Sequence, residues 1–327
     1  MSQANTLSVL VKALRWEAPG IISLELVPVP GGGEQALPTF AAGSHIDLHL
    51  GGGFVRSYSL LDMADAPARY RVAVLRDRAS RGGSRAVHEQ LRVGQTITIS
   101  APRNNFALHE DAARSVLLAG GIGITPILCM ARRLKALGRP VELIYAARSQ
   151  GEAAFHDEIL ALGIPVHWHF DAQAGGPPDL RALLAARAGG ENAATTHFYA
   201  CGPTPMLDGF VATAEALGLK NAHIERFTAV EQAAASDALG SYEVVLQKSG
   251  KVIQVTPDKG LLATLRDAGA DVIYSCEEGI CGTCETKVIE GEPDHRDSVL
   301  SASERAANKT MMICVSGCKS ARLVLDL

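Results

Sequence analysis

Four cysteines near the C-terminus have a spacing that could hold a metal cluster. Cys276, Cys281 and Cys284 follow the pattern Cys-x4-Cys-x2-Cys, and Cys314 stands farther along the chain. In the plant-type arrangement, thiolates at this spacing ligate a 2Fe-2S cluster. Such a cluster carries one electron at a time. The spacing therefore predicts redox chemistry, with an electron source elsewhere in the chain.

Two other uses of cysteine fit the pattern less well. A structural zinc site usually presents two short Cys-x2-Cys pairs, whereas this chain has one. Disulfides are disfavoured because seven cysteines is an odd count and the first residues predict no secretory leader. Of the remaining thiols, Cys129 is expected in a helical core, Cys201 belongs to a second motif, and Cys318 is the reserve for Cys314 as fourth ligand.

A glycine-rich segment follows the apolar run from Val116 to Ala119. It reads Gly120-Gly121-Ile122-Gly123-Ile124-Thr125-Pro126. Small residues let the backbone approach a pyrophosphate, Thr125 can cap a helix starting at Pro126, and the N-terminus of that helix favours phosphate. Taken alone, such a turn serves helix–strand packing equally well.

A second loop supports a nucleotide site. Cys201-Gly202-Pro203, with Met206 behind it, is expected to end a later strand of the same sheet. Both loops would project from one edge, where a dinucleotide can bridge them. Asp171 can accept hydrogen bonds from a ribose and favours NADH, although an ordinary loop aspartate is an equal reading. Arg148 can hold a 2′-phosphate and leaves NADPH open.

A one-electron cluster and a hydride donor need a converter, and a flavin is the usual one. The segment Arg56-Ser57-Tyr58-Ser59-Leu60 has suitable side chains. Arginine can neutralise a phosphate, tyrosine can lie against the isoalloxazine ring, and serine can hydrogen-bond its polar edge. Alone, the segment is an ordinary strand with alternating polar residues. Beside the nucleotide loops and the cysteines, the flavin interpretation is preferred.

The elements that would position these residues change along the chain. Residues 1–108 show a period of two with Gly/Pro punctuation, which predicts a small antiparallel barrel. Residues 109–227 alternate strand and helix, which predicts a parallel α/β domain. An alanine-rich linker is expected at 228–240, and residues 241–327 then give a hairpin, a short helix, the cysteine loop and a final strand. The fold class is multi-domain, mixing α/β and β.

Composition agrees with this division. A chain of 327 residues with 47% hydrophobic content has enough apolar material for two or three cores. A formal charge of -4 without a basic block argues against nucleic-acid binding. The longest apolar run, at 115–131, is broken by glycines and a proline, so no membrane span is expected. These features favour a cytoplasmic protein.

With its motifs in this order, the chain resembles the phthalate dioxygenase reductase family of the ferredoxin-NADP reductase superfamily, which includes vanillate demethylase reductases. The resemblance covers essentially the whole chain. The family's flavin motif Arg-x-Tyr-Ser matches Arg56, Tyr58 and Ser59, and its two nucleotide motifs match 120–126 and 201–203. Its flavin-flanking strand and its phosphate-binding Gly-Gly-Ser match Ala73, Val74, Leu75, Arg76, Gly82, Gly83 and Ser84.

The resemblance also implies roles and cofactors. It implies FMN in the barrel, NADH in the α/β domain and a C-terminal β-grasp ferredoxin domain. Thr125, Glu225 and Ser59 would line the hydride-transfer region, and Phe227 would lie against the flavin or, in the simpler reading, anchor the linker. Cys318 stands where the family leads us to expect another residue.

The expected activity is an NADH-dependent reductase that passes electrons from FMN through the 2Fe-2S cluster to a Rieske-type aromatic oxygenase. Acidic residues Glu277, Glu278 and Glu285 beside the cysteines could steer that partner, although such residues are often merely solvated. Two alternatives are a stand-alone flavin reductase and a redox-sensing module. The sequence gives no aromatic substrate and no oligomeric state.

Overall fold

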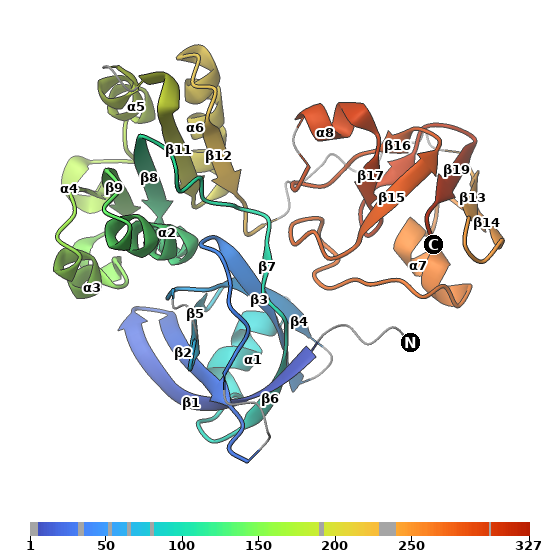
Figure 1. Cartoon of the computed structure of the whole chain (residues 1–327), viewed down its shortest axis with the longest axis horizontal. Coiled ribbons are helices and arrows are strands. Elements are labelled where there is room, and N and C mark those ends of the chain that lie inside the picture. Colours follow the sequence, from blue (N-terminus) through green and yellow to red (C-terminus); the bar gives the residue numbers. More distant parts are fainter. Residues whose placement is uncertain are drawn as a thin grey trace. The chain divides into compact units, whose positions relative to one another are not determined.

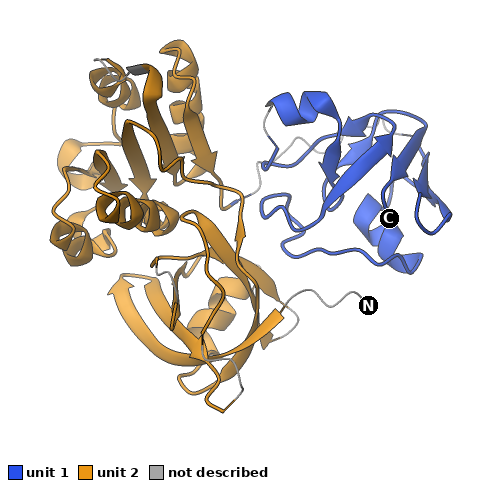
Figure 2. Cartoon of the chain, viewed as in Figure 1, with its two compact units in different colours: residues 1–4, 228–327 blue, residues 5–227 orange. Residues whose placement is uncertain are grey.

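The computed structural model describes residues 6–31, 36–51, 54–63, 67–78, 82–189, 193–228, 240–300 and 302–327. The chain divides into two compact units, one of residues 5–227 and one that contains residues 228–327 (Figure 2). Nearly all of the linker predicted at 228–240 lies outside the described residues, as does Arg81 beside the Gly-Gly-Ser motif.

The first sheet of the larger unit is antiparallel, as the period of two predicts. Its elements are β1 (Thr6–Ala18), β2 (Ile21–Pro28), β3 (Ser44–His49), β4 (Val55–Ser59), β5 (Tyr70–Leu75), α1 (Gly83–Glu89), β6 (Thr96–Ser100) and β7 (Arg103–Asn104). The described strands have the order β4-β3-β6-β1-β2-β5, and β7 pairs with β3 (Figure 1). An isolated antiparallel bridge between Leu60 and Val72 joins the two edges of this sheet. The sheet therefore curls into the predicted barrel-like form.

The second sheet alternates strand and helix. Its elements are β8 (Arg114–Gly120), η2 (Gly121–Gly123), α2 (Ile124–Ala136), β9 (Val141–Ala147), η3 (Gln150–Glu152), α3 (His156–Ala161), β10 (Val166–Phe170), α4 (Asp171–Ala174), α5 (Leu180–Ala188), η4 (Ala193–Thr195), β11 (Thr196–Cys201), α6 (Thr204–Ala216) and β12 (Ala222–Glu225). The described strands are parallel in the order β10-β9-β8-β11-β12.

Helices cover both faces of the parallel sheet, which buries its strands (Figure 1). The α2 helix packs on one face with Leu117, Leu143 and Tyr199, and α5 and α6 pack on the other. The strand order reverses beside β8, because β9 lies on one side of it and β11 on the other. In such sheets the crevice for a ligand opens at the carboxyl ends of the strands at this point.

The two sheets of residues 5–227 share a hydrophobic core. Ala18, Leu61 and Phe106 from the antiparallel part belong to the same buried cluster as the apolar face of α2. The boundary predicted at 108/109 therefore separates two sheets that pack as one unit. This packing fixes the flavin region relative to the nucleotide region.

A charged network crosses the same interface. Arg71 of β5 forms two hydrogen bonds with Glu158 of α3, at 2.8 and 2.5 Å. Arg132 of α2 bonds Glu158 and Asp62, and its Nη1 also donates to the carbonyl oxygen of Leu61 at 2.8 Å. Burial by itself would raise the pKa of Glu158, but the two guanidinium groups outweigh it and lower that pKa.

The smaller unit has the predicted hairpin, short helix and final strand. Its elements are β13 (Tyr242–Leu246), β14 (Val252–Val255), α7 (Leu261–Asp267), β15 (Glu285–Glu290), β16 (Pro293–Asp294), α8 (Ala302–Ala307), β17 (Thr310–Met312), β18 (Gly317–Cys318) and β19 (Arg322–Leu325). The main sheet has the order β14-β13-β19-β15-β17, with β19 parallel to β13. A helix that packs on a mixed sheet in this way is the β-grasp arrangement. Its core contains Val244, Leu265 and Leu323.

Candidate functional site

Arg56 and the Gly-Gly-Ser segment converge in the antiparallel part. A Cβ on Gly83 would lie 2.6 Å from Cγ of Arg56, and one on Gly82 would lie 2.5 Å from Cζ of Phe54. Gly82 also has a φ of +109°, which disfavours any side chain. The guanidinium of Arg56 is thereby held beside the first turn of α1. A fixed cation next to backbone amides fits a phosphate group.

The neighbouring residues of β4 point to alternate faces. Tyr58 packs against the barrel core, and burial raises its pKa to about 12. Ser57 points the other way and donates to Oδ1 of Asp47 at 2.6 Å, so its hydroxyl is already used within the sheet. Ser59 is buried at the end of β4. Of the predicted flavin residues on this strand, Ser57 has its hydroxyl group taken up by the barrel sheet itself.

The strand predicted to flank the flavin, Ala73–Arg76, coincides with the end of β5 and the residue after it. Among the described residues, β5 pairs with β2 on one side and with the chain after β4 only near Val72. Beyond that bridge the backbone from Ala73 to Leu75 has no strand partner on the β4 side. This edge can hydrogen-bond the polar rim of an isoalloxazine ring. Arg76 itself pairs with Glu89 at 2.5 Å.

Glu225 comes from the other sheet to meet Ser59. It ends β12, and its carboxyl group hydrogen-bonds the hydroxyl of Ser59. Burial raises the pKa of Glu225 to about 8, so the carboxyl group is mostly neutral at pH 7. Its Oε2 atom is buried and lacks a hydrogen-bond partner among the described residues. A buried polar atom of this kind fits a site that a ligand completes.

The two predicted nucleotide loops meet at the carboxyl ends of β8 and β11. A Cβ on Gly123 would lie 2.2 Å from the carbonyl oxygen of Cys201, and one on Gly120 would lie 2.8 Å from Sδ of Met206 and from Cδ of Pro203. A Cβ on Gly202 would lie 2.4 Å from Cε of Met206. Only glycine allows this approach. The two loops therefore meet at the strand reversal, where a dinucleotide crevice is expected.

The start of α2 differs from the expectation. The helix begins at Ile124 rather than Pro126, and its N-cap is Gly123 without a side-chain cap. The hydroxyl of Thr125 is buried and donates to the carbonyl oxygen of Ile122 at 3.1 Å. Thr125 therefore braces the loop instead of capping the helix. The prediction missed this because a threonine within the first turn can bond backward to a free carbonyl group.

Asp171 and Arg148 lie together at the same edge of the sheet. Asp171 follows β10, and Arg148 follows β9. The backbone amide of Ala172 donates to the carbonyl oxygen of Arg148 at 2.9 Å. Both side chains are solvent-accessible; that of Arg148 is 80% exposed, against 40% for Asp171. Nε2 of His169 lies 3.4 Å from Oδ1 of Asp171.

Phe227 follows β12, at the other side of the sheet from Asp171. Its ring is partly buried and packs against the core cluster shared by the two sheets. It follows Arg226, whose Nη2 donates to Oδ1 of Asp208 at 2.6 Å. The chain is thus anchored just before Phe227.

The four predicted cluster cysteines form two adjacent pairs. Cys276 hydrogen-bonds Cys281, and Cys284 hydrogen-bonds Cys314. The hydrogen bond between Cys276 and Cys281 lowers the pKa of the Cys281 thiol and raises that of Cys276, because the pair shares a proton that iron would displace. Cys276, Cys281 and Cys284 are buried, and Cys314 is half-buried. This donor set fits a 2Fe-2S cluster.

The loop around these cysteines is tightly wound. Glu277 and Gly279 have φ values of 56° and 69°. The amide of Glu278 donates to Sγ of Cys276 at 3.3 Å, and Sγ of Cys281 lies 3.1 Å from Oγ1 of Thr283. Such donors near sulfur tune the potential of a cluster.

Cys318 is turned toward a different part of the unit. It lies in β18, where its thiol contacts the carbonyl oxygen of Ser320 at 3.2 Å and the hydroxyl of the same residue at 3.1 Å. This geometry supports Cys314, and not Cys318, as the fourth ligand.

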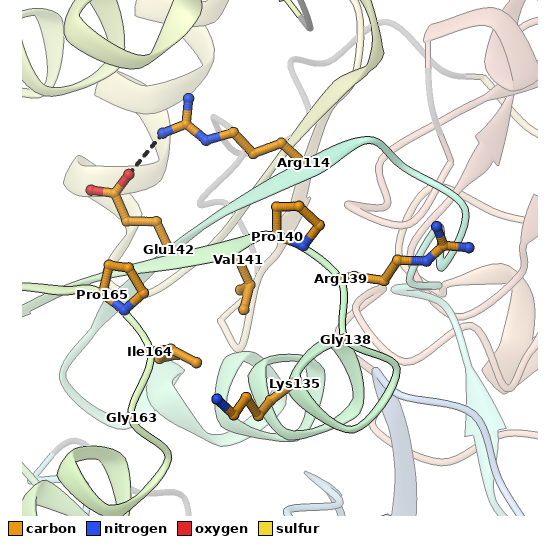
Figure 3. Close-up of a pocket in the computed structure, with 10 residues that line it drawn as sticks. All are labelled: Arg114, Lys135, Gly138, Arg139, Pro140, Val141, Glu142, Gly163, Ile164 and Pro165. Carbon is orange, nitrogen blue, oxygen red and sulfur yellow. Dashed lines mark hydrogen bonds and ion pairs between the residues drawn. The ribbon is translucent and has the colours of Figure 1, made fainter.

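A separate pocket of about 450 Å³ lies at the opposite edge of the parallel sheet (Figure 3). Its lining includes Arg114, Val141 and Pro165, which stand at the amino ends of β8, β9 and β10. Glu142 is paired with Arg114 at 2.9 Å. This pocket is remote from the loops that would receive a nucleotide.

Sequence reasoning missed three residues that contribute to these sites. Phe54 packs against Gly82 and beneath the guanidinium of Arg56, with 5.6 Å from Cζ to the ring centroid. Tyr145 donates to the carbonyl oxygen of Gly121 at 3.2 Å. Thr283 could have been suspected, since it stands between two ligands. The other two depend on tertiary contacts.

Comparisons with known proteins agree with the geometry. An oxidoreductase NAD-binding domain matches residues 117–212, and a 2Fe-2S iron-sulfur cluster binding domain matches residues 244–319. The chain is 46% identical to a vanillate O-demethylase oxidoreductase of Pseudomonas sp. (strain HR199 / DSM 7063), over 98% of this chain and 100% of the relative. It is 45% identical to a tetrachlorobenzoquinone reductase of Sphingobium chlorophenolicum, over 99% and 98%.

Two solved structures are also similar. Phthalate dioxygenase reductase, described as a modular structure for electron transfer from pyridine nucleotides to [2Fe-2S], is 35% identical with a TM-score of 0.70, over 98% of both chains. An intact type IV self-sufficient cytochrome P450 monooxygenase is 39% identical with a TM-score of 0.89, over 98% of this chain. This chain spans only 41% of that monooxygenase.

An NAD-binding sheet, a flavin-type barrel and a 2Fe-2S domain on one chain define an electron-transfer oxidoreductase. The chain belongs to the family of the phthalate dioxygenase and vanillate O-demethylase reductases. No helix within the described ranges has both the length and the apolar character needed to cross a bilayer.

Proposed function

We propose that the chain is the NADH-dependent reductase component of a Rieske-type aromatic oxygenase system and that its electrons pass through FMN and the 2Fe-2S cluster to the oxygenase. The observation that carries this proposal is the contact between Ser59 and Glu225 beside the two nucleotide loops. It brings the flavin strand and the nicotinamide crevice to one point within a single packed unit.

The names of relatives support the oxygenase partner. Besides the vanillate O-demethylase oxidoreductase, the chain is 43% identical to phenoxybenzoate dioxygenase subunit beta of Ectopseudomonas oleovorans, over 100% of both sequences. Phthalate dioxygenase reductase has a title that names electron transfer from pyridine nucleotides to [2Fe-2S]. FMN is favoured because the cradle at Arg56, Gly82 and Gly83 suits one phosphate group.

Each residue has a task in this scheme. A bound flavin takes up a hydride as an electron pair and gives the electrons up singly, which is what a 2Fe-2S partner requires. Arg56 would hold the flavin phosphate, and Tyr58, packed on the barrel core, would lie next to the flavin. Phe227 would pack against the ring, and the loop braced by Thr125 would receive the nicotinamide. Neutral Glu225 can donate a hydrogen bond without placing a negative charge beside the reacting atoms.

NADH is favoured over NADPH at the other end of the crevice. The carboxylate of Asp171 can accept hydrogen bonds from a ribose and would repel a 2′-phosphate. Arg148 is the group that could receive such a phosphate, but its exposed side chain already lies 3.9 Å from Glu152. Replacement of Asp171 by Asn is therefore expected to narrow the preference for NADH over NADPH.

Two anaerobic measurements test the scheme. The absorption spectrum of the purified protein should contain flavin and ferredoxin-type bands, and both should fade on addition of NADH. Cys276→Ser should abolish cytochrome c reduction and spare flavin bleaching, because the cluster follows the flavin. Retained cytochrome c reduction, or a preparation without FMN or acid-labile sulfide, would contradict the scheme.

The tetrachlorobenzoquinone reductase similarity favours one second function, direct reduction of a small oxidant by a stand-alone flavin reductase. That activity does not need the cluster. Two results together would support the second function over the first. Cys276→Ser would reduce a quinone at the rate of the unaltered protein, and the unaltered protein would transfer no electrons to any oxygenase.

A further inference from the structure

Three histidines form a cluster at the amino ends of β11 and β12, away from the proposed flavin and nucleotide sites of the same unit. His197 lies in β11, His223 in β12, and His109 in the segment between β7 and β8. One ring nitrogen from each lies within 4.8 Å of the other two. Nδ1 of His197 and Nε2 of His223 are 3.0 Å apart.

The cluster rests on a rigid base. The hydroxyl of Tyr199 accepts a hydrogen bond from the amide of His109 at 2.9 Å, and its ring stacks on that of His223 at 4.7 Å between centroids. The rings of His197 and His223 differ by 8° in orientation. The two strand histidines are half-buried, whereas His109 is exposed and can rotate. Two ligand positions are therefore fixed and the third is adjustable.

The spacing suits one metal ion. Zinc binds imidazole nitrogen at about 2.0–2.1 Å, which places two ligands of a tetrahedral ion about 3.3 Å apart. In the metal-free chain His197 and His223 share a hydrogen bond of 3.0 Å, near this separation, so an ion would replace the proton between them. Rotation of His109 can bring in its nitrogen.

We infer that His109, His197 and His223 form a binding site for a borderline divalent transition-metal ion such as Zn²⁺. Three imidazoles without a carboxylate in the first shell select zinc, nickel or copper over magnesium or calcium. Water completes the coordination, and the charge of Asp111 lies near enough to act on His197. The ion ties the chain between the two sheets to the strands β11 and β12.

Zinc binding to the loaded protein tests the inference. Protein with its full iron content is dialysed at pH 7.5 against micromolar Zn²⁺, and zinc and iron are measured by atomic emission. We expect about one zinc per chain, since one ion uses all three ligands. His109→Ala and His197→Gln should each weaken binding by about 100-fold or more, because even an outer-shell change costs about 10–100-fold.

His167→Ala is the matched control, since His167 is exposed on β10 of the same sheet and outside the cluster. Zinc should raise the melting temperature of the unaltered protein and of this control, but not that of His109→Ala. Exposed His109 can be replaced with little risk to folding, and the far-UV spectrum and flavin content check this. Absence of zinc from the unaltered protein, or equal zinc in His109→Ala and the control, would overturn the inference.

Discussion

Gly123→Ala probes the contact between the two nucleotide loops directly. The added Cβ would lie 2.2 Å from the carbonyl oxygen of Cys201, 2.4 Å from its carbonyl carbon and 2.7 Å from the amide nitrogen of Gly202. All three are backbone atoms, so no side chain can rotate away. The loops must separate by about 1 Å to restore ordinary contact, and overpacking of this kind costs about 1–3 kcal/mol.

Part of that cost should appear as lost cofactor affinity. If about 1.4 kcal/mol of it falls on the complex with NADH, the dissociation constant rises about tenfold. The assay is stopped-flow flavin reduction over a range of NADH concentrations, with flavin content measured beforehand. We expect a weaker NADH affinity with normal flavin content, because Gly123 is remote from the cradle at Arg56.

Gly151→Ala is the control, since a Cβ there meets no atom within 4 Å and the backbone has no positive φ. It should bind NADH like the unaltered protein. Normal NADH affinity together with normal thermal stability in Gly123→Ala would refute the reasoning, because it would mean that the loops do not lie as described.

Three other outcomes are expected. Glu225→Gln should be more stable than the unaltered protein at alkaline pH. Because the pKa of Glu225 is raised on folding, the stability that its neutral carboxyl group contributes is fully present below about pH 4.5 and is lost as the pH rises toward 8. The loss in the free energy of unfolding is about 3–5 kcal/mol. Thermal unfolding of both proteins from pH 5 to 9 measures this loss. If the melting temperatures of the two proteins change with pH in the same way, the carboxyl group of Glu225 is not neutral in the folded state. Glu158→Gln should lower stability by about 1–3 kcal/mol because it leaves the buried Arg71 guanidinium without its bidentate partner, while Glu89→Gln in an exposed pair should change melting little. Glu277→Gln combined with Glu285→Gln should slow reduction of the oxygenase at low salt and have little effect at high salt; equal slopes against ionic strength in both proteins would argue against steering.

Local patterns predicted much of this architecture because they are set by neighbouring residues. Ile46 and Leu48 alternate with polar residues on β3 because their face of the strand is buried. The strand–helix order after Ser115 is visible because these strands are buried on both faces. Likewise, the spacing of Cys276, Cys281 and Cys284 is a property of one loop. In each case a short segment carries the whole signal.

Such local patterns could not predict contacts between segments that are distant in the sequence. The carboxyl group of Glu225 meets Ser59 only because two sheets share a core, and the network of Arg71, Arg132 and Glu158 joins three elements across it. Ser57 has the right position in the motif, yet its hydroxyl is taken by Asp47. These outcomes depend on sheet order and packing, which a single sequence does not specify.

The surroundings of the cysteines divide them by chemical role. Burial raises the pKa of Cys129 to about 12, and burial together with the charge of Glu225 raises that of Cys201. Both thiols therefore stay protonated at neutral pH and are poor nucleophiles, even though Cys201 adjoins the nicotinamide crevice. In the smaller unit the bond from Cys276 instead lowers the pKa of the Cys281 thiol. A buried, protonated Cys201 acts as a small apolar wall beside Gly123.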